Sequence, residues 1–368
     1  MVLVKAKRDE LLGPLSAVSG IIERRHTLPI LSNVLIERGT GSLSFLATDI
    51  EIQITSQGVV EHAGEARSLT VGARKLVDIL RALPESAEVT LQQQDKRLLV
   101  KAGRSKFVLQ TLPAEDFPRL GDAGAVLGKV TLPQKAFREL LLLVQYSMAQ
   151  QDIRYYLNGL LMVVEDKTLK LIATDGHRLA FASLGLDAKL PRQEVIVPRK
   201  TVLELGKLLS DSDAEVRIEL SAAQAAFSFG TVELVSKLID GKFPDYTRVI
   251  PVGHKNQLSI GREVLRQALM RAAILSNEKF RGVRWVLTDG SLKIVSSNTE
   301  QEEAEEVIEV GYKGDALDIG FNVNYLLDVL NNVAGSEEEC RFGDAASSAL
   351  LSFPSEAEFK YVVMPMRI

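Results

Sequence analysis

Asp175 and His177, in the segment TDGHR, have the residue types and the spacing that could carry acid–base chemistry. A carboxylate and an imidazole this close in the chain could act as an acid–base pair or supply half of a metal site. The alternative is a loop at the end of a strand, with the histidine either exposed or packed. We favour the loop, because the whole chain has only four histidines.

The sequence motifs of common enzyme classes are absent. Lys129, Lys207 and Lys242 each follow a glycine, but none is followed by Ser or Thr, so the chain has no GxxxxGK[ST] phosphate loop. GTGSLS, at 39–44, has two glycines at dinucleotide-binding spacing and no third. GxSxG, HExxH and paired CxxC are also missing. We therefore expect a protein without catalytic activity, cofactor or metal.

Composition bounds the class of protein. A chain of 368 residues, 46% of them apolar, suits two or three domains. The net charge of −4 argues against tight, static binding to nucleic acid, which usually requires a basic domain. Cys340 is the single cysteine, so no intrachain disulfide can form and a reducing compartment is favoured. The sequence shows no signal-peptide layout and no membrane-length apolar run. We expect a cytoplasmic protein with no membrane partner.

The same phrase occurs three times along the chain. SLSFLATDIE at 42–51 returns as TLKLIATDGH at 168–177, and more weakly as SLKIVSSNTE at 291–300. The spacing between copies is 126 and then 123 residues, and it persists at other landmarks. Such a period indicates one domain copied three times. The later landmarks are TVGARKLVDILRAL from Thr70, IVPRKTVLELGKLL from Ile196 and GFNVNYLLDVLNNV from Gly320.

Each copy is predicted to contain a helix, a β-meander, a shorter helix and a second β-meander. The first helices are expected at roughly 8–22, 133–148 and 262–276, where apolar residues recur at helical spacing. Between the helices the pattern alternates, with turn signals such as Glu165-Asp166 and Asp289-Gly290. The fold class is therefore α+β with antiparallel sheets, in three domains at 1–125, 126–252 and 253–368.

Three segments have the character of binding surfaces. In QQDIRYYLNG (150–159), adjacent tyrosines in a strand would point to opposite faces, so at least one must face solvent or a partner. EQEEAEE (300–306) is strongly acidic, whereas KRLLVKAGRSKF (96–107) is basic. An acidic edge in the last domain and a basic edge in the first favour a head-to-tail assembly that closes into a ring. The apolar C-terminus, YVVMPMRI, is expected to be docked.

Domain size indicates how many domains such a ring contains. A domain of this length has a diameter of roughly 35 Å by compact-chain scaling. Three touching spheres of that size leave a gap of only about 5 Å, whereas six leave a gap of about one sphere diameter. A duplex roughly 20 Å across would pass through a ring of two chains, but not through one chain.

The three-unit organisation also resembles a known family. LPIL (28–31), QDIRYYLNG, ATDGHRLA, VIVPRK, DGKFPDY, ILSNEKFRGVR, EQEEAEE and VVMPMRI are similar to segments of the bacterial DNA polymerase sliding clamps, the β subunits of polymerase III. The resemblance implies a head-to-tail homodimer: a ring of six similar domains, with helices lining the hole and sheets outside. Such a ring encircles double-stranded DNA without sequence specificity and has no catalytic activity. The implied partners are the replicative polymerase catalytic subunit, the clamp loader complex, and repair and translesion polymerases.

The resemblance also implies three sets of site residues. The DNA-contacting set is Arg25, Arg74, Gln151, Tyr155, Tyr156 and Lys200. The peptide-binding groove is Leu157, Thr174, Gly176, His177, Arg178, Leu179, Pro244, Arg248, Val249, Val362, Val363, Met364, Pro365, Met366 and Arg367. The dimer interface is Arg97, Arg104, Lys106 and Phe107 of one chain against Ile274, Leu275, Glu300, Glu302, Glu303 and Glu305 of the other.

Two other classes of function stay open from the residues alone. A hydrolase centred on Asp175 and His177 would lose turnover when the histidine is replaced. A scaffold unrelated to DNA would not be retained on circular duplexes.

Overall fold

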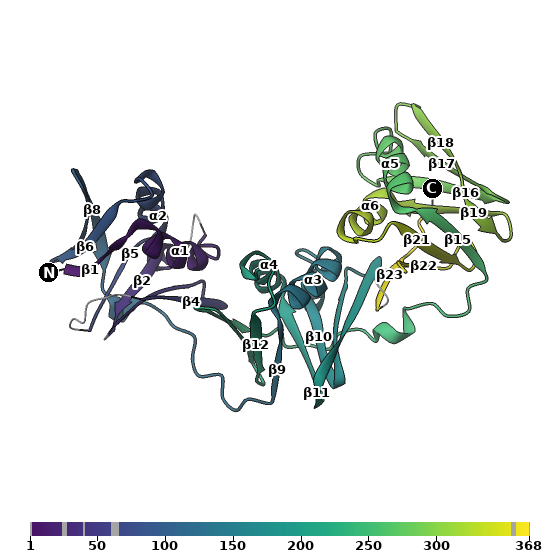
Figure 1. The fold of residues 1–368 in the computed structure, drawn as a ribbon. Coiled ribbons are helices and arrows are strands. Elements are labelled where there is room, and N and C mark those ends of the chain that lie inside the picture. The colour runs from purple at the N-terminus through teal and green to yellow at the C-terminus, as the bar shows by residue number, and fades with distance from the viewer. Residues whose placement is uncertain (1, 24–27, 40, 60–65, 355–357, 368) are drawn as a thin grey trace. The chain divides into compact units, whose positions relative to one another are not determined.

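The chain contains three tandem copies of one α+β unit, as the sequence predicts (Figure 1). The computed structural model describes residues 2–23, 28–39, 41–59, 66–354 and 358–367. Each copy contributes one longer and one shorter helix. The helices are α1 Arg8–Ser19, α2 Ala73–Ala82, α3 Gln134–Val144, α4 Arg199–Leu208, α5 Arg262–Ala273 and α6 Val323–Asn332.

The first helix of each copy ends earlier than expected. The expected ends at Ile22, Met148 and Ser276 lie beyond the observed ends at Ser19, Val144 and Ala273. The reason is that the apolar residues continue past the last helical turn. Ile22 and Met148 are still buried, but they belong to the segments that follow α1 and α3. Periodic burial therefore marks the core face correctly and the helix end poorly.

The chain divides into two compact units, and each unit contains part of the middle copy. The first unit comprises residues 1–138 and 203–238. Its antiparallel sheet has twelve strands in the order β1-β6-β7-β8-β5-β2-β3-β4-β14-β13-β12-β9. The strands are β1 Val2–Lys7, β2 Asn33–Arg38, β3 Ser42–Thr48, β4 Ile52–Val59, β5 Arg67–Gly72, β6 Glu88–Gln94, β7 Arg97–Ala102, β8 Ser105–Leu112, β9 Gly128–Pro133, β12 Glu215–Leu220, β13 Gln224–Phe229 and β14 Val232–Lys237.

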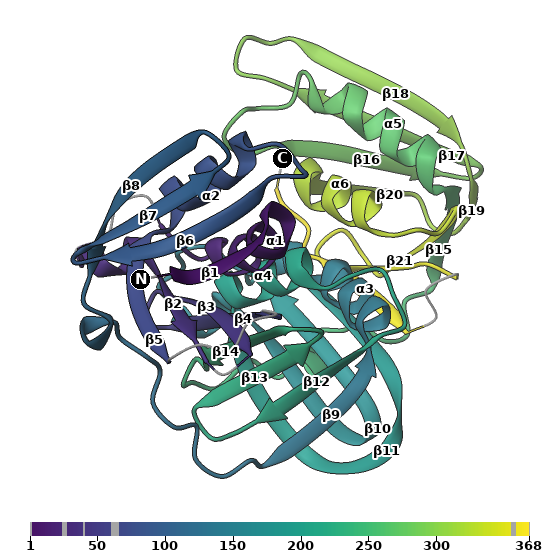
Figure 2. The ribbon, with the colours of Figure 1, turned by 60° about the vertical axis from the view of Figure 1, so that its left-hand side comes forward.

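The second unit comprises residues 139–202 and 239–368. It has a seven-stranded sheet, β10-β11-β23-β22-β21-β15-β19, and a four-stranded sheet, β18-β17-β16-β20. Helix α5 packs on β17 and β18, and α6 packs beside β20 (Figure 2). The strands are β10 Gly159–Thr174, β11 Arg178–Pro198, β15 Asn256–Gly261, β16 Gly282–Thr288, β17 Ser291–Ser297, β18 Glu303–Glu309, β19 Gly311–Lys313, β20 Leu317–Asn322, β21 Glu337–Phe342, β22 Ala349–Ser352 and β23 Phe359–Val363.

The copies are joined by strand pairing. At the first joint, β4 of the first copy pairs antiparallel with β14 of the second, from Ile52–Ser56 to Val232–Ser236. At the second joint, β11 of the second copy pairs with β23 of the third, from Arg178–Ala182 to Phe359–Val363. Each joint makes one continuous sheet from two copies, which explains why the middle copy is divided between the compact units.

Strands β8 and β18 are among the strands that retain an open edge in the described part of the chain. Strand β8 pairs with β7 along its length, but with β5 only at Thr111 and Leu112. Strand β18 pairs only with β17 and ends its four-stranded sheet. Such edges present unpaired backbone groups that favour pairing with another chain.

A buried carboxyl group lies in the third copy. Glu338, on β21, is fully buried among apolar side chains, and its Oε1 accepts a bond from Cys340 Sγ at 3.1 Å. Its Oε2 has no partner in the structure. Burial raises the pKa of Glu338 to about 7, and the bond from Cys340 lowers it in part. The folded state therefore binds a proton that the unfolded chain, with a glutamate pKa of about 4.3, has already released.

This carboxyl group predicts a pH-dependent stability. Because the pKa of Glu338 is raised on folding, stability falls as pH rises from about 4.5 to about 7, by about 3 kcal/mol in all. In Glu338→Gln this dependence is lost, so its melting temperature relative to the unchanged protein should increase between pH 5 and pH 7 and level off above that in scanning calorimetry. Glu337→Gln, at an exposed position of the same strand, is the control. A difference independent of pH would contradict the prediction.

Candidate protein-binding groove

The TDGHR segment forms a tight turn between β10 and β11. Thr174 Oγ1 donates to the carbonyl of Arg178 at 2.6 Å and accepts from the amide of Gly176 at 3.0 Å. Asp175 Oδ1 accepts from the amides of His177 and Arg178 at 2.9 and 3.1 Å. The Asp175 carboxylate thus stabilises the backbone of the turn. This agrees with the interpretation of the segment as a loop at the end of a strand.

A pocket of about 220 Å³ lies beside this turn. Leu157, Leu179 and Val362 are buried in the hydrophobic cluster next to it, and Met364 is 46% exposed. The surface is apolar with a polar rim, which suits a short peptide anchored by a few apolar side chains. The lining residues are Arg154, Tyr156, Leu157, Thr174, Gly176, His177, Arg178, Leu179, Phe243, Pro244, Val249, Val362 and Met364.

Most of the residues predicted for a groove line this pocket, although they come from three distant segments. Arg248 does not: its side chain points to Asp245, with Nε to Oδ2 at 3.0 Å. Val363 is fully buried within the paired strand β23. The remaining predicted residues that do not line the pocket are Pro365, Met366 and Arg367. The amide of Met366 binds the carbonyl of Gly320 at 2.9 Å, which docks the end of the chain on β20.

Sequence reasoning missed three lining residues. Arg154, Tyr156 and Phe243 were not predicted to belong to the groove. The repeated Phe-Pro pair at 117–118 and 243–244 was a usable signal, because a phenylalanine kept at the same place in two copies marks a common core position. Nothing in the sequence pattern indicated that Arg154 lies beside the turn.

Arg178 joins the groove to the helices beneath it. Its guanidinium bonds to Asp175 Oδ2 at 3.1 Å, Asp328 Oδ2 at 2.5 Å and the carbonyl of Tyr146 at 2.6 Å. It also lies over the ring of Tyr325, 4.4 Å from the centroid. Burial opposes the charge, but Tyr361, Asp328 and Asp175 raise the pKa of Arg178 overall. A charge held at so many points fixes the wall of the pocket.

The predicted tyrosines lie in a short helix rather than in a strand. Residues Tyr155–Leu157 form a 3₁₀ turn, in which Tyr156 packs on the groove cluster and Tyr155 is 58% exposed. Their rings meet edge to face, with centroids 5.8 Å apart. The expectation that one tyrosine is packed and the other is free holds, but the geometry that produces it is different.

The other residues predicted to contact DNA are placed at separate points. Arg74 is exposed in the first turn of α2 and donates to the carbonyl of Ile22 at 3.3 Å. Gln151 has a positive φ of 55° in an exposed turn, and Lys200 lies in the first turn of α4. Arg25 lies outside the described residues.

The residues predicted for a dimer interface lie on two different edges. Arg97, Arg104, Lys106 and Phe107 belong to the β7–β8 hairpin, which carries one open edge. Ile274 and Leu275 follow α5, whereas Glu303 and Glu305 lie on β18, which carries the other. Glu300 and Glu302 lie in the turn that precedes β18, where Asn298 Oδ1 accepts from both of their amides at 3.0 Å.

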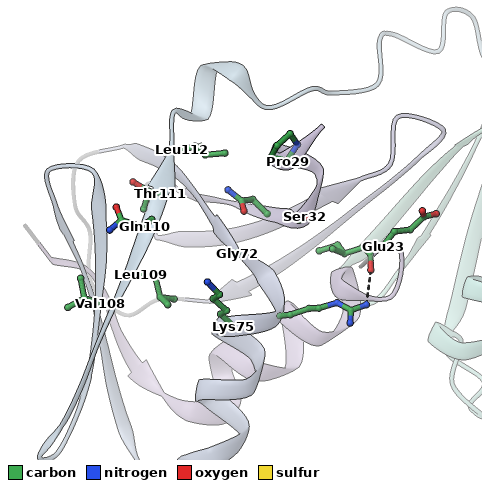
Figure 3. Close-up of a pocket in the computed structure, with 13 residues that line it drawn as sticks. Glu23, Pro29, Ser32, Gly72, Lys75, Val108, Leu109, Gln110, Thr111 and Leu112 are labelled. Atoms are coloured by element: carbon green, nitrogen blue, oxygen red, sulfur yellow. Dashed lines mark hydrogen bonds between the residues drawn. The ribbon is translucent and has the colours of Figure 1, made fainter. Parts of the chain in front are cut away.

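A larger pocket, of about 440 Å³, adjoins the open edge of β8 (Figure 3). Its walls are the Val108–Leu112 part of β8, the start of α2 and the segment around Pro29 and Ser32. Lys75 points into the space between these walls in Figure 3, and the dashed line there is the bond between Arg74 and the Ile22 carbonyl. Apolar side chains such as Val108 and Leu112 line the pocket together with the charged residues Glu23, Arg74 and Lys75.

The fold and the groove define the class: a binding protein of three tandem α+β units, joined by strand pairing and carrying a peptide-sized apolar groove at one joint. Profiles described as the N-terminal, central and C-terminal domains of the DNA polymerase III beta subunit match residues 3–121, 131–245 and 247–367. The chain belongs to this family of bacterial beta sliding clamps. It is a non-catalytic processivity factor that works with DNA polymerase on DNA.

Known relatives match over nearly the full length. The chain is 47% identical to the beta sliding clamp of Pseudomonas aeruginosa over 365 residues, covering 98% of this chain and 99% of that one. It is 45% identical to that of Escherichia coli K12 over 362 residues, with the same coverage. The crystal structure of the P. aeruginosa DNA polymerase III subunit beta has a TM-score of 0.96 at 46% identity, covering all of both chains. A P. aeruginosa sliding clamp bound to griselimycin also has a TM-score of 0.96 at 46% identity and full coverage.

No helix in the described part of the chain could cross a membrane.

Proposed function

We propose that two copies of this chain close head to tail into a ring around duplex DNA, and that the groove tethers polymerases and other partners to it. The observation that carries the proposal is the pair of open edges, on β8 and β18. The first and second copies follow one rule, in which the strand after the repeated turn pairs with the last strand of the next copy. The third copy has no next copy in its own chain, so its partner is the first copy of a second chain.

The register of the two internal joints is the same. At the first joint, Gln53 lies opposite Val235, and the amide of Lys237 binds the carbonyl of Glu51 at 2.9 Å. At the second joint, Leu179 lies opposite Val362, and the amide of Met364 binds the carbonyl of His177 at 2.9 Å. These are corresponding positions of the repeat. The register is therefore a property of the repeated unit, and it can be applied to a pairing between β18 and β8.

Transferring this register to β18 and β8 places Glu303 opposite Val108. Glu303 corresponds to Gln53, because each pairs with the last residue of the preceding strand, Ser297 or Thr48. The same register places Glu305 opposite Lys106, a pair of opposite charges. At the second joint the matching position is occupied by Lys360, whose Nζ lies 5.8 Å from the ring of Phe181, directly across the joint.

The pocket in Figure 3 fits this register. Continuing the pairing along β8 brings Glu300 of the partner subunit opposite Thr111, which lines the pocket together with Lys75. An acidic turn that meets Arg74 and Lys75 supplies electrostatic complementarity, which fixes the register of association. The apolar residues Phe107, Ile274 and Leu275 supply contact area.

A charge swap tests the ring. Lys106→Glu places like charges against Glu305 at both joints, and we expect it to weaken the dimer by about 2 kcal/mol, or roughly thirtyfold, in sedimentation equilibrium. Adding Glu305→Lys restores the opposite pair and should recover most of the affinity. Lys255→Glu, which changes the net charge equally at an exposed site away from both edges, is the control. If the double variant is no tighter than Lys106→Glu, the proposed register is wrong.

The proposed DNA contacts are few, and Arg74, Gln151 and Tyr155 among them are exposed. Arg74, Lys200 and Arg25 would meet phosphates, and Gln151, Tyr155 and Tyr156 would add polar and aromatic contacts without reading bases. A ring linked topologically to its duplex needs little phosphate affinity, which agrees with the net charge of −4.

Retention on circular DNA tests this mode of binding. After a clamp loader assembles the ring on a nicked plasmid, we expect it to stay bound through gel filtration at high salt and to dissociate when the plasmid is cut once. Linkage survives salt, whereas phosphate contacts do not. Lys106→Glu, whose dimer is expected to be weaker, should be retained less well than the unchanged protein. Equal retention on circular and linear plasmids would exclude encirclement.

The proposed partners of the groove are short peptide segments of the polymerase catalytic subunit, the clamp loader, and repair and translesion polymerases. An apolar groove with an exposed methionine accommodates different side chains, which favours exchange between partners. We further propose a cytoplasmic protein with domain limits at 1–125, 126–252 and 253–368.

A matched methionine pair tests the groove. Met364→Asp puts a charge at the pocket and should weaken binding of a polymerase-tail peptide at least tenfold in calorimetry, because an aspartate there must lose water without a partner. Met270→Asp, on α5 at a similar exposure of 45%, is the control and should leave peptide affinity unchanged. Equal losses in the two variants would show that the effect is not local to the groove.

A further inference from the structure

The turn at the groove has a counterpart in the first copy whose hydrogen bonds match one for one. Thr48 Oγ1 donates to the carbonyl of Ile52 at 2.8 Å and accepts from the amide of Ile50 at 3.0 Å. Asp49 Oδ1 accepts from the amides of Glu51 and Ile52 at 2.9 and 2.8 Å. The same four bonds hold the Thr174–Arg178 turn, so Ile50 occupies the position of Gly176.

Backbone conformation does not explain the residue at this position. Ile50 has φ 71° and Gly176 has φ 90°, both in the left-handed region. Glycine adopts that region freely, whereas a β-branched residue there is a strained outlier. Glycine would therefore be the easier choice in both turns. The two positions must therefore differ in what surrounds a side chain placed there.

At Gly176 the neighbouring group is the guanidinium of Arg154. A Cβ atom on Gly176 would lie 2.8 Å from Arg154 Nη1 and 2.9 Å from Nη2, closer than atoms can pack. The guanidinium rests on the glycine because it is tethered there. Asp152 binds it through Nε at 3.0 Å and Nη2 at 2.8 Å, and the carbonyl of Asp175 accepts from Nη2 at 3.1 Å. This bond from Arg154 lowers the pKa of Asp152 to about 2.

In the first copy, both members of the pair are apolar. The amide of Leu31 binds the carbonyl of Leu28 at 3.1 Å, as that of Leu157 binds Arg154 at 2.8 Å, so Leu28 stands at the position of Arg154. Leu28 and Ile50 are 49% and 42% exposed. The first joint therefore carries two half-exposed branched side chains at the positions where the groove has an arginine lying against a glycine.

We infer that the Arg154–Gly176 contact is a positioning device that keeps the groove open, and that Leu28 and Ile50 close the corresponding place at the first joint. Gly176 and Arg154 thereby determine which joint of the chain receives peptides. The inference rests on the proposed function of the groove and adds the reason why one joint carries it.

A double-mutant cycle tests the contact. Gly176→Asn keeps a residue that tolerates positive φ, but its side chain must displace the Arg154 guanidinium. We expect calorimetry with a polymerase-tail peptide to show at least tenfold weaker binding for Gly176→Asn than for the unchanged protein. In an Arg154→Ala background, where the displaced group is missing, the same substitution should cost less than threefold. The stoichiometry of the unchanged protein should be one peptide per chain.

The outcomes separate this inference from the proposed function. If the unchanged protein binds no peptide, the groove function itself is wrong. If it binds and Gly176→Asn costs the same factor in both backgrounds, the glycine does not act through Arg154 and the inference fails. Two peptides per chain would also overturn it, because the first joint would then be receptive. Melting temperature and dimer affinity of each variant confirm that the fold is retained.

Discussion

Backbone hydrogen bonding at the edges of the sheets is the constraint on which this structure depends. Each copy of the unit ends in strands whose amides and carbonyls need partners. Within the chain, two such strands are paired between copies: β4 pairs with β14, and β11 pairs with β23. Strands β8 and β18 retain open edges. The proposed head-to-tail ring would pair every copy with the next in the same way.

Charge adds direction to this backbone rule. The open β8 edge carries Lys106 and the open β18 edge carries Glu305, so pairing is favoured between unlike edges and disfavoured between two copies of the same edge. Opposite charges also occur within one chain, where Glu306 binds Arg271 at 2.7 Å and Glu305 binds Lys293 at 2.6 Å. These exposed pairs hold the acidic side chains on their strand and contribute little stability by themselves.

The sequence predicted what depends on local pattern and on repetition. The period located the three copies, their helices and the turn at Asp175, because these follow from apolar spacing and turn chemistry. The division of the middle copy between two sheets was not predictable, since any strand edge could pair with any other. The resemblance brought together most of the groove, but Arg154 was missed because its place depends on the Asp152 tether and on the absence of a Cβ at Gly176. Met366 was expected in the groove, yet its amide is bound to Gly320.

One repeated turn acquires three different roles through single residues. In all three copies an Asp or Asn side chain, at 49, 175 or 298, accepts backbone amides and sets the strand that follows. With Ile50 beside it the turn precedes the strand that forms the first joint, whereas with Gly176 it adjoins the groove. In the third copy it carries Glu300 and Glu302 and faces a partner subunit in the proposed ring. Because the side-chain hydrogen bonds preserve the backbone, the neighbouring positions are free to differ. Duplication of one unit can therefore yield packing, recognition and assembly without a new fold.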